Sequence, residues 1–296
     1  MRVLVIIVTY NGMSWIERCL KSIEKSDMPL DTYIVDNGSS DGTKEYVKKW
    51  GKCVAFVESD VNLGFGKANN LGLKYALDNN YDYAYLLNQD AWLFKSTMKA
   101  LIAVHNAHPE YGILSPTQIK KDEKHFETIF GSEVCPRIKD RNLAEDLYFN
   151  QLDDVYEVPD VMAAHWLISK ECLKRVGGFS PIFPHYGEDD NYVNRTRYHG
   201  FKVGFVPGAK AVHDADSHPA DRRKRIYLSN IFMLTTLEKV WDAYQHPYYI
   251  AFRYAVKMSI VLKTMKPLLF WMKHVVNRKE ILAYRERSRA ECPFLA

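Results

Sequence analysis

Short apolar runs alternate with stretches of helical periodicity through residues 1–90, and this alternation constrains the fold more than any other feature of the sequence. The first run, VLVIIV at residues 3–8, is continuous and β-branched, as expected of a strand covered on both faces. Comparable runs follow at residues 32–36, 53–58 and 82–88, with helical patterns between them. Strands that alternate with helices predict an α/β fold with a doubly wound, mostly parallel sheet. Such sheets bind ligands at the carboxyl ends of their strands.

The pattern changes further along the chain. Residues 118–156 carry scattered charge and little apolar periodicity, so we expect an excursion over the surface. It is either an ordinary insertion or part of a wall that binds an acceptor. Two short strands are expected at residues 202–207 and 210–213, and the later patterns are helical. We therefore divide the chain into an α/β domain over residues 1–220 and a helical extension over residues 221–296.

The composition is that of an ordinary globular protein, with 47% hydrophobic and 26% charged residues in 296. Its five cysteines are widely spaced, with no pair at zinc-ligand or redox spacing, so we expect a reducing, cytoplasmic compartment. The opening MRVLVIIV is too short for the apolar region of a signal peptide. No uncharged run approaches the length that spans a bilayer.

Charge is distributed unevenly along the chain. Residues 1–220 hold 25 Lys and Arg against 30 Asp and Glu, whereas residues 221–296 hold 15 against 6. The basic character therefore belongs to the C-terminal quarter and bears on the partners of that region.

Polar clusters follow each of the four strands expected in the first ninety residues. Any one of them is explained by turn chemistry alone, so Asp90 by itself is as much a solvated strand end as a metal ligand. Four such clusters on one edge of a sheet point instead to a bound nucleotide. Asp36 suits the N3–H of a uracil or thymine ring, because a carboxylate only accepts hydrogen bonds. The clusters are Thr9-Tyr10-Asn11, Asp36-Asn37-Gly38, Asn62-Leu63-Gly64 and Asn88-Gln89-Asp90.

Two common nucleotide-binding motifs are missing from the sequence. No G-x-G-x-x-G follows the first strand, and no G-x-x-x-x-G-K-[ST] phosphate loop occurs. Their absence argues against dinucleotide cofactors and against phosphoryl-transfer ATPases.

A wider set of motifs resembles a known family. In order and spacing, the segments VTYNG, VDNGSSDGT, NLGFGKANN, LLNQDAW, GEDDNYVNR and AVH resemble the family 2 inverting nucleotide-sugar glycosyltransferases. Within that family the chain is most similar to the bacterial rhamnosyltransferase-like branch, and the resemblance runs from Val3 to His213. It implies a fold of the glycosyltransferase A (GT-A) type, a bound Mn²⁺ or Mg²⁺ ion, and inversion of the anomeric centre.

The resemblance also implies roles for individual residues. Asp36 sits where the family contacts the base, and Asp90 sits where it holds the metal. His213 matches a histidine that often completes the metal site. Asp189 matches the catalytic base, and Glu188 lies beside it. The other nucleotide-binding positions that it implies are Thr9, Tyr10, Asn11, Asn62, Lys67, Asn69, Asn88 and Gln89.

The chemistry of sugar transfer is consistent with these residue types. A nucleoside diphosphate leaving group gains negative charge, which a hard divalent cation bound by few protein ligands neutralises. One positioned carboxylate can take the proton of the attacking hydroxyl, and the acids flanking Asp189 favour a raised pKa there. Taken without the resemblance, GEDDNY is equally well an acidic helix N-terminus. His213 alone is more typical of a surface histidine than of a ligand.

Two positions depart from the family pattern. Asn88 replaces the first acid of the D-x-D metal motif, so the predicted metal site rests on Asp90 and His213. Asn191 stands where a second acid often follows the E-D pair. The Q-x-x-R-W signature of processive synthases is missing, which favours the addition of one or a few sugars.

The basic extension opens with four consecutive cations at residues 222–225. In the rhamnosyltransferase-like branch a comparable segment lies near the diphosphate, so Arg225 and Tyr227 are candidate contacts. A solvated helix start explains the same residues equally well.

An apolar face with helical spacing follows, and cations lie largely on the opposite face. We expect Pro267 to kink or divide this helix. The face suits an anionic inner-membrane surface that carries a lipid-linked acceptor. Packing on the catalytic domain, or against a second subunit in a homodimer, accounts for it equally well. Its members are Tyr254, Met258, Val261, Met265, Leu269, Met272 and Val276.

These observations together predict an inverting, metal-dependent glycosyltransferase. It would move a sugar from a UDP- or dTDP-sugar to a saccharide or lipid-linked acceptor in surface polysaccharide synthesis, in the cytoplasm and with possible contact to the inner membrane face. Two other classes stay open: a scaffold that binds nucleotide-sugar without turnover, and a metal-dependent nucleotidyl- or phosphotransferase. Nucleic acid is not expected as a partner, because base-reading motifs are missing.

Overall fold

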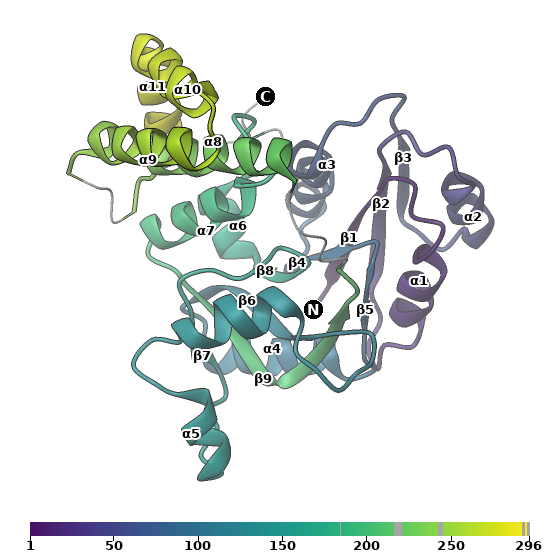
Figure 1. The fold of residues 1–296 in the computed structure, drawn as a ribbon. Helices are drawn as coiled ribbons and strands as arrows, with labels where there is room; N and C mark the ends of the chain where they lie inside the picture. Colours follow the sequence, from purple (N-terminus) through teal and green to yellow (C-terminus); the bar gives the residue numbers. More distant parts are fainter. Residues whose placement is uncertain (184, 216–220, 242–244, 292–293, 295–296) are drawn as a thin grey trace.

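A nine-stranded sheet organises the computed structural model, which describes residues 1–183, 185–215, 221–241, 245–291 and 294. The strand order is β3-β2-β1-β4-β8-β6-β9-β5, and β7 pairs with β9. Helices cover the sheet, and a further group of helices lies to one side (Figure 1). The strands are β1 (Val3–Thr9), β2 (Asp31–Asp36), β3 (Ala55–Glu58), β4 (Tyr83–Asn88), β5 (Ala91–Leu93), β6 (Tyr111–Ile119), β7 (Tyr156–Glu157), β8 (His165–Ser169) and β9 (Lys202–His213).

The helices fall into two groups along the chain. Those that accompany the strands are α1 (Ile16–Glu24), α2 (Thr43–Trp50), α3 (Phe65–Asp78), α4 (Thr97–Ala107), α5 (Leu143–Tyr148), α6 (Lys170–Val176) and α7 (Glu188–Tyr198). Those of the C-terminal region are α8 (Arg222–Glu238), α9 (Pro247–Val261), α10 (Lys266–Val276) and α11 (Arg278–Arg289).

The four N-terminal strands are parallel, as the sequence predicts. Thr9 at the end of β1 pairs with Asp36 at the end of β2, and Val8 pairs with Asn88 at the end of β4. The polar clusters that follow these strands therefore meet at one edge of the sheet, which confirms the expected place for a ligand.

β1 shows why its sequence is apolar without interruption. Leu4 and Ile6 are buried in the cluster that includes α3, whereas Val5 and Ile7 are buried in the cluster that includes α1 and α4. Each such side chain contributes about 1.5–3 kcal/mol when it is removed from water. A strand between two helical layers must be apolar on both faces.

The second half of the sheet is mixed. β8 runs antiparallel to β4 and β6, and β5 runs antiparallel to β9. The two short strands expected at residues 202–207 and 210–213 are one strand, β9, whose pairing with β6 jumps from Val206 to Lys210. This bulge accommodates Pro207, which lacks an N–H to donate, without ending the strand.

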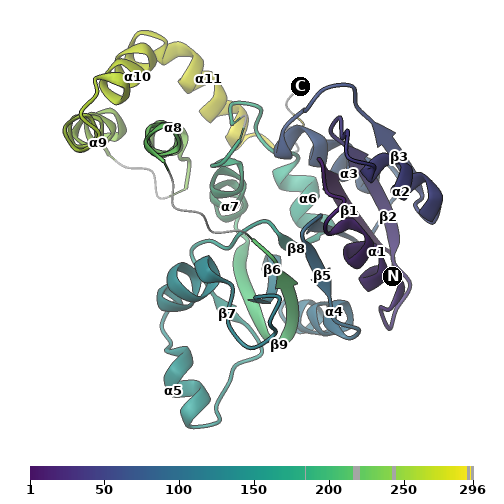
Figure 2. The ribbon, with the colours of Figure 1, turned by 45° about the vertical axis from the view of Figure 1, so that its right-hand side comes forward.

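The expected surface excursion is largely irregular. Residues 118–156 contain the end of β6, two short helical turns, α5 and the first residue of β7. α5 projects away from the sheet at the bottom of Figures 1 and 2.

The C-terminal helices form their own small core beside α6 and α7 (Figures 1 and 2). Pro267 divides the predicted helix, since α9 ends at Val261 and Pro267 lies in the first turn of α10. The proposed domain boundary falls at residues 216–220, outside the described part of the chain, and stays a prediction.

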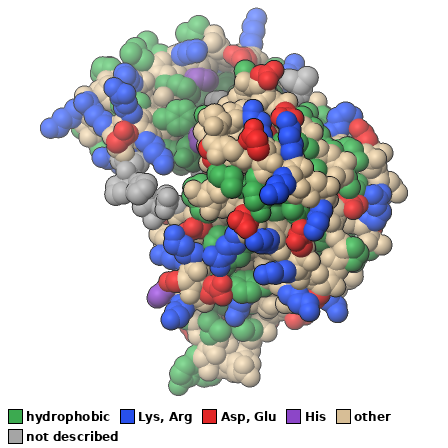
Figure 3. Space-filling view, turned by 90° about the vertical axis from the view of Figure 1, so that its right-hand side faces the viewer, with side chains coloured by type: hydrophobic (Ala, Val, Ile, Leu, Met, Phe, Trp, Pro, Cys, Tyr) green, Lys and Arg blue, Asp and Glu red, His purple; other side chains and the backbone are tan. Residues whose placement is uncertain are grey.

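Most of the predicted apolar face of this region is exposed, although its first member, Tyr254, packs against the small core. Ala251 and Ala255 face the small core instead, because the break between α9 and α10 interrupts the helical phase assumed from the sequence. Hydrophobic and basic side chains both lie on this group of helices, at the upper left of Figure 3. No helix in the described part of the chain is both long enough and apolar enough to cross a membrane. Five members of the face are 50–83% exposed: Val261, Met265, Leu269, Met272 and Val276.

Candidate active site

A cavity of about 750 Å³, here called the strand-end cavity, opens at the carboxyl ends of β1, β2 and β4. The segment that leads into α7 supplies its opposite wall through Phe183 and His185. Six of the residues that the sequence assigned to nucleotide or metal line this cavity: Tyr10, Asn62, Lys67, Asn88, Gln89 and Asp90.

Gln89 ties two of the strand ends together. Its side-chain oxygen accepts the Tyr10 N–H at 2.9 Å, and its side-chain nitrogen donates to the Tyr10 carbonyl at 3.1 Å. Gly12 makes this contact possible, because a Cβ there would lie 2.2 Å from the Gln89 oxygen.

Asp36 occupies a different environment from the one that the resemblance implies. The side chain is fully buried and accepts hydrogen bonds from the Thr9 hydroxyl at 2.8 Å and from the N–H groups of Gly38 and Ser39 at 3.1 and 2.8 Å. Its oxygens thus hold the turn after β2 and are not presented to a base. The neighbouring Asn37 lines the cavity and donates to the Gly64 carbonyl at 3.3 Å.

Three other predicted nucleotide contacts do not line the cavity, and one of them, Asn11, is exposed outside it. Thr9 is buried against Asp36, and Asn69 donates to the Phe65 carbonyl at 3.0 Å. The side-chain oxygen of Asn11 accepts the Ser40 N–H at 2.9 Å. Sequence position alone does not distinguish such supporting residues from those that face the ligand.

Asp90 and His213 face each other across the join between β5 and β9. Ala91 pairs with His213 in the antiparallel register, which places Asp90 Oδ1 at 3.8 Å from His213 Nε2. Nδ1 of His213 is buried and has no hydrogen-bond partner among the described residues. An acid and an imidazole at this separation fit one divalent cation.

No group of three or more His, Cys, Asp or Glu side chains within the described ranges is arranged to hold a metal. Mg²⁺ is often bound by one or two protein carboxylates together with substrate phosphates and water, so a site with two protein ligands is compatible with such an ion.

His165, which no sequence motif singled out, contacts the strand residue next to His213. It is fully buried, and burial lowers its pKa to about 3. Its Nε2 lies 3.0 Å from the Val212 carbonyl, which can only accept, so Nε2 carries the proton. Nδ1 then accepts from the Tyr85 hydroxyl at 2.9 Å. The neutral ring thus fixes the strand residue next to His213.

Three consecutive acids begin α7. Gly187 precedes them with φ +80°, and a Cβ there would lie 2.7 Å from Ile231 of α8, so glycine permits the close approach of the two helices. Glu188 is buried with one carboxylate oxygen unpartnered among the described residues, and burial raises its pKa to about 7. Asp189 is half-buried, and burial followed by the charge of Glu188 raises its pKa above the usual range.

The start of α8 contacts the wall of the strand-end cavity. The Tyr227 hydroxyl donates to the His185 carbonyl at 2.6 Å, and burial followed by the nearby Glu188 raises its pKa. Arg225 is exposed on the same helix. Asp221 caps α8 by accepting the Lys224 N–H at 2.7 Å, so the helix start is also explained locally.

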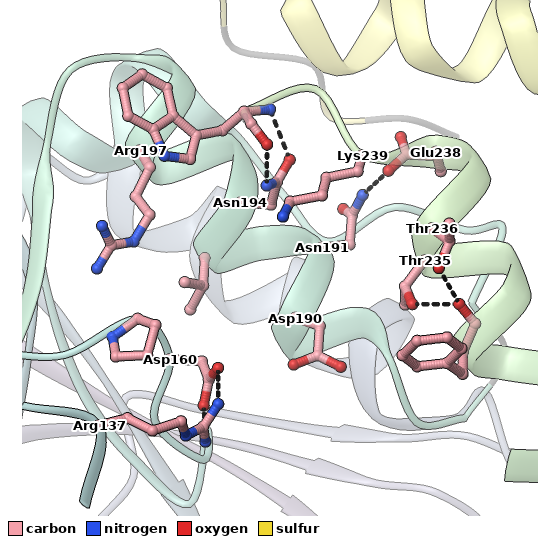
Figure 4. Close-up of a pocket in the computed structure, with 14 residues that line it drawn as sticks. Arg137, Asp160, Asp190, Asn191, Asn194, Arg197, Thr235, Thr236, Glu238 and Lys239 are labelled. Carbon is pink, nitrogen blue, oxygen red and sulfur yellow. Dashed lines mark hydrogen bonds and ion pairs between the residues drawn. The ribbon is translucent and has the colours of Figure 1, made fainter. Parts of the chain in front are cut away.

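A second cavity of about 490 Å³, here called the α7–α8 cavity, lies along the other side of α7. Asp190 lines it from the first turn of that helix, and Asp160 lines it from the segment after β7 (Figure 4). Phe232 and Trp241 contribute aromatic side chains. Asp160, Phe232 and Trp241 are far from Asp190 in the sequence and, unlike it, lie outside the motifs noted above.

The family model for glycosyl transferase family 2 matches residues 4–177, which is more than half of the chain. The chain belongs to glycosyltransferase family 2. The family resemblance read from the sequence motifs is thus confirmed.

Relatives of this family 2 glycosyltransferase include two rhamnosyltransferases. The N-acetylglucosaminyl-diphospho-decaprenol L-rhamnosyltransferase of Mycobacterium tuberculosis is 25% identical over 76% of this chain and 82% of that protein. The dTDP-rhamnosyl transferase RfbF of Shigella flexneri is 24% identical over 70% of this chain and 67% of its own length. The low-salt glycan biosynthesis hexosyltransferase Agl10 of Haloferax volcanii is 23% identical over 64% of this chain, and the match spans 60% of that relative.

Solved glycosyltransferase structures share the fold. TarS 1–349 of Staphylococcus aureus in complex with UDP aligns with a TM-score of 0.57 and 18% identity, over 88% of this chain and 72% of that one. The mannosyltransferase PcManGT of Pyrobaculum calidifontis in complex with GDP-Man and Mn²⁺ aligns with a TM-score of 0.61 and 19% identity, over 95% and 78%. The predicted GT-A fold is confirmed.

Proposed function

We propose that this chain transfers a sugar from a UDP- or dTDP-sugar to a hydroxyl of a saccharide or lipid-linked acceptor, with inversion, in surface polysaccharide synthesis. One observation carries the proposal: the strand-end cavity is bordered by Asp90 of the Asp90–His213 pair and, opposite, by the segment that enters the acidic start of α7. A donor in this cavity would have its diphosphate near the pair and its sugar near the carboxylates.

A pyrimidine base suits the inner end of the cavity. Asn37 lines this end, where its side chain accepts the Leu63 N–H at 3.4 Å and donates to the Gly64 carbonyl at 3.3 Å; its second lone pair and second N–H match the N3–H and adjacent carbonyl of uracil or thymine. Tyr10 is about half exposed at the same wall and offers a ring face for stacking. Two of the related proteins also involve pyrimidine nucleotides, dTDP for RfbF and UDP for the TarS complex, whereas PcManGT was solved with GDP-Man.

Asp90 and His213 would hold Mn²⁺ or Mg²⁺. When bound, the ion would neutralise charge on the departing diphosphate. Solved members of the fold contain Mn²⁺, which supports divalent metal use without fixing the ion. Arg225 and Tyr227 at the start of α8 are further candidate diphosphate contacts, since Tyr227 bonds to the cavity wall at His185.

Asp189 would act as the base. The acceptor hydroxyl gives its proton to the Asp189 carboxylate, and the hydroxyl oxygen forms the new bond to the anomeric carbon. The bond from that carbon to the diphosphate oxygen breaks, and its electron pair leaves with the nucleoside diphosphate. The raised pKa of Asp189 increases its basicity, and Glu188, the second contributor to that shift after burial, tunes the base.

The exposed face of α9 and α10 would contact an anionic membrane surface. Apolar side chains such as Met265 and Leu269 stand beside exposed Lys263, Lys266 and Lys273. This combination is typical of helices that lie in the interfacial region of a bilayer. The M. tuberculosis relative is named for a decaprenol-linked acceptor, which accords with a membrane-borne substrate here.

Incubation of the protein with Mn²⁺ and UDP-glucose, UDP-galactose, UDP-N-acetylglucosamine or dTDP-rhamnose tests the proposal. Release of UDP or dTDP, faster with a saccharide acceptor, is the expected result. Release of nucleoside monophosphate and sugar phosphate would indicate a nucleotidyltransferase instead. Donor binding without release of any nucleotide under these conditions would favour a non-catalytic scaffold. The presence of only one acid, Asp90, in the metal motif is consistent with that alternative.

A further inference from the structure

We propose that the α7–α8 cavity binds the acceptor as a neutral saccharide ring, stacked on Trp241 and Phe232 and hydrogen-bonded by Asp160 and Asp190. This inference rests on the proposed transferase function and specifies its acceptor site. It is supported by the exposed aromatic rings of the cavity, by its two carboxylates and by its position beside the start of α7.

The aromatic side of the cavity is open. Trp241 is 45% exposed and Phe232 is 44% exposed, so both present uncovered ring surface. Phe232 is kept in place by Tyr254 of α9, at 4.3 Å between ring centroids. Pyranose rings have an apolar C–H face that packs on such surfaces, whose π-electrons attract the polarised C–H groups.

Trp241 is held by the same helix that carries the acids. The Asn194 side-chain oxygen on α7 accepts the N–H groups of Val240 and Trp241 at 2.8 and 3.0 Å, and its nitrogen donates to the Trp241 carbonyl at 3.0 Å. Asn194 lies one helical turn after Asp190. The aromatic platform and the carboxylate are therefore positioned by one rigid element (Figure 4).

The polar side of the cavity suits hydroxyl groups. Asp160 and Asp190 point toward a common space in Figure 4, and carboxylates accept hydrogen bonds from vicinal hydroxyls. Arg137 donates to both oxygens of Asp160, at 2.6 and 2.7 Å, which fixes the orientation of that carboxylate.

The charges around the cavity favour a neutral ligand over a phosphate. Arg137 is paired with Asp160, and Arg197 donates to the Val158 carbonyl and lies 3.5 Å from Glu157. These two guanidinium groups already have anionic or carbonyl partners, and Lys239, the third cation in the lining, also has a partner. A phosphate would have to compete with those partners and would meet the carboxylate of Asp190 as well.

The location fits an acceptor. Asp189 and Asp190 are adjacent in the first turn of α7, so a sugar beside Asp190 would lie next to the residue proposed as the base. The donor cavity lies on the other side of this turn, where Phe183 and His185 line it. The two substrates would approach the base from opposite sides of one helix start.

Ligand-observed saturation-transfer NMR of the intact protein tests this directly. The probes are methyl glycosides of glucose, galactose, mannose, rhamnose and N-acetylglucosamine, with inorganic pyrophosphate as a competitor of the other class. We expect at least one glycoside to receive saturation, unaffected by pyrophosphate. The signal should fall at least fivefold in Trp241→Ala and in Phe232→Leu, and it should persist in Tyr148→Ala, an exposed aromatic on α5 that serves as the matched control.

Equal saturation in wild type and both cavity variants, no saturation by any glycoside, or loss on addition of pyrophosphate would overturn the assignment. Thermal unfolding checks that each variant is folded. If Trp241→Ala does not fold, Phe232→Leu alone provides the test. Donor-induced stabilisation with Mn²⁺ is measured on the same variants and should be unchanged. If the donor with Mn²⁺ does not stabilise the wild-type protein, the proposed function is refuted instead.

Discussion

Asp90 and His213 are 123 positions apart in the sequence, yet their side chains lie 3.8 Å apart because β5 and β9 pair in antiparallel register. The pair joins a short strand after β4 to the last strand of the sheet. A site with so few protein ligands depends on each of them.

Asp90→Ala should therefore weaken Mn²⁺-dependent donor binding by about 10- to 100-fold, the scale of losing a metal-site interaction. The shift in thermal midpoint caused by UDP-sugar or dTDP-sugar, with and without Mn²⁺, measures this. Asp122→Ala, an exposed acid in the surface excursion, is the control and should leave the shift intact. Unaltered Mn²⁺ dependence in Asp90→Ala would remove Asp90 from the metal site.

Asp189→Asn should lower transfer by about 10²–10⁴-fold while donor binding stays close to that of the wild type. The amide keeps the shape of the side chain but cannot take a proton at neutral pH. Steady-state transfer and donor-induced thermal stabilisation separate the two effects. Asp190→Asn should instead raise the acceptor KM, and a turnover loss confined to Asp190→Asn would transfer the base role to that residue.

Glu188→Gln should stabilise the fold more at pH 8 than at pH 5. Burial raises the pKa of Glu188 from about 4.5 to about 7, so between these pH values the native state binds more protons than the unfolded chain. The free energy of unfolding contributed by this group therefore falls as pH rises through that window, by up to about 3 kcal/mol. Urea unfolding of the wild type and Glu188→Gln at pH 5 and pH 8 measures the difference in their free energies of unfolding. A difference that is the same at both pH values would contradict the prediction.

Gly72→Ala should destabilise the protein by about 1–3 kcal/mol, although alanine favours helices. A Cβ at this position of α3 would lie 2.6 Å from Ile6 Cγ2 in β1, inside the core. Lys74→Ala on the exposed side of the same helix should change stability little. Denaturant unfolding compares them, and equal midpoints would show that α3 can move away from β1 freely.

Leu269→Glu and Met272→Glu should each reduce binding to phosphatidylglycerol vesicles by about tenfold, because both place a charge on the exposed face of α10. Vesicle flotation at low and high salt measures binding, and weaker binding at high salt is expected from the neighbouring lysines. Leu147→Glu on α5 is the control and should behave as wild type. A wild-type protein that dimerises through this face and ignores vesicles would favour the homodimer alternative.

Local patterns sufficed for the parallel half of the fold. VLVIIV, the runs that follow it and their polar ends report on contacts with the nearest strands and helices, so they placed Asn88, Gln89 and Asp90 at the correct edge. The mixed half depends on which distant strands meet. The pairing of β8 with β4, and the bulge that keeps β9 continuous, arise from tertiary packing that no short window contains.

The same limit applies to the candidate site. Asp36 and Asn37 are neighbours in a turn, and only the folded chain shows that Asp36 is buried against Thr9 while Asn37 lines the cavity. Five of the seven residues grouped on one apolar face are exposed, but Tyr254 packs against the C-terminal core, because the break before Pro267 interrupts the helical phase. Asn194 and Trp241 are 47 residues apart, so their contact could not be predicted from any short stretch of sequence.

The bond between Asn194 and the Trp241 backbone has a mechanical consequence. If the C-terminal helices sway relative to the sheet, the loop carrying Trp241 is tethered to α7 and must follow it. The spacing between a sugar resting on that indole and the carboxylates at the head of α7 would then be preserved through the motion. Helix α7 would therefore keep the acceptor hydroxyl at a constant distance from Asp189, even if the entrance to the α7–α8 cavity widened or narrowed.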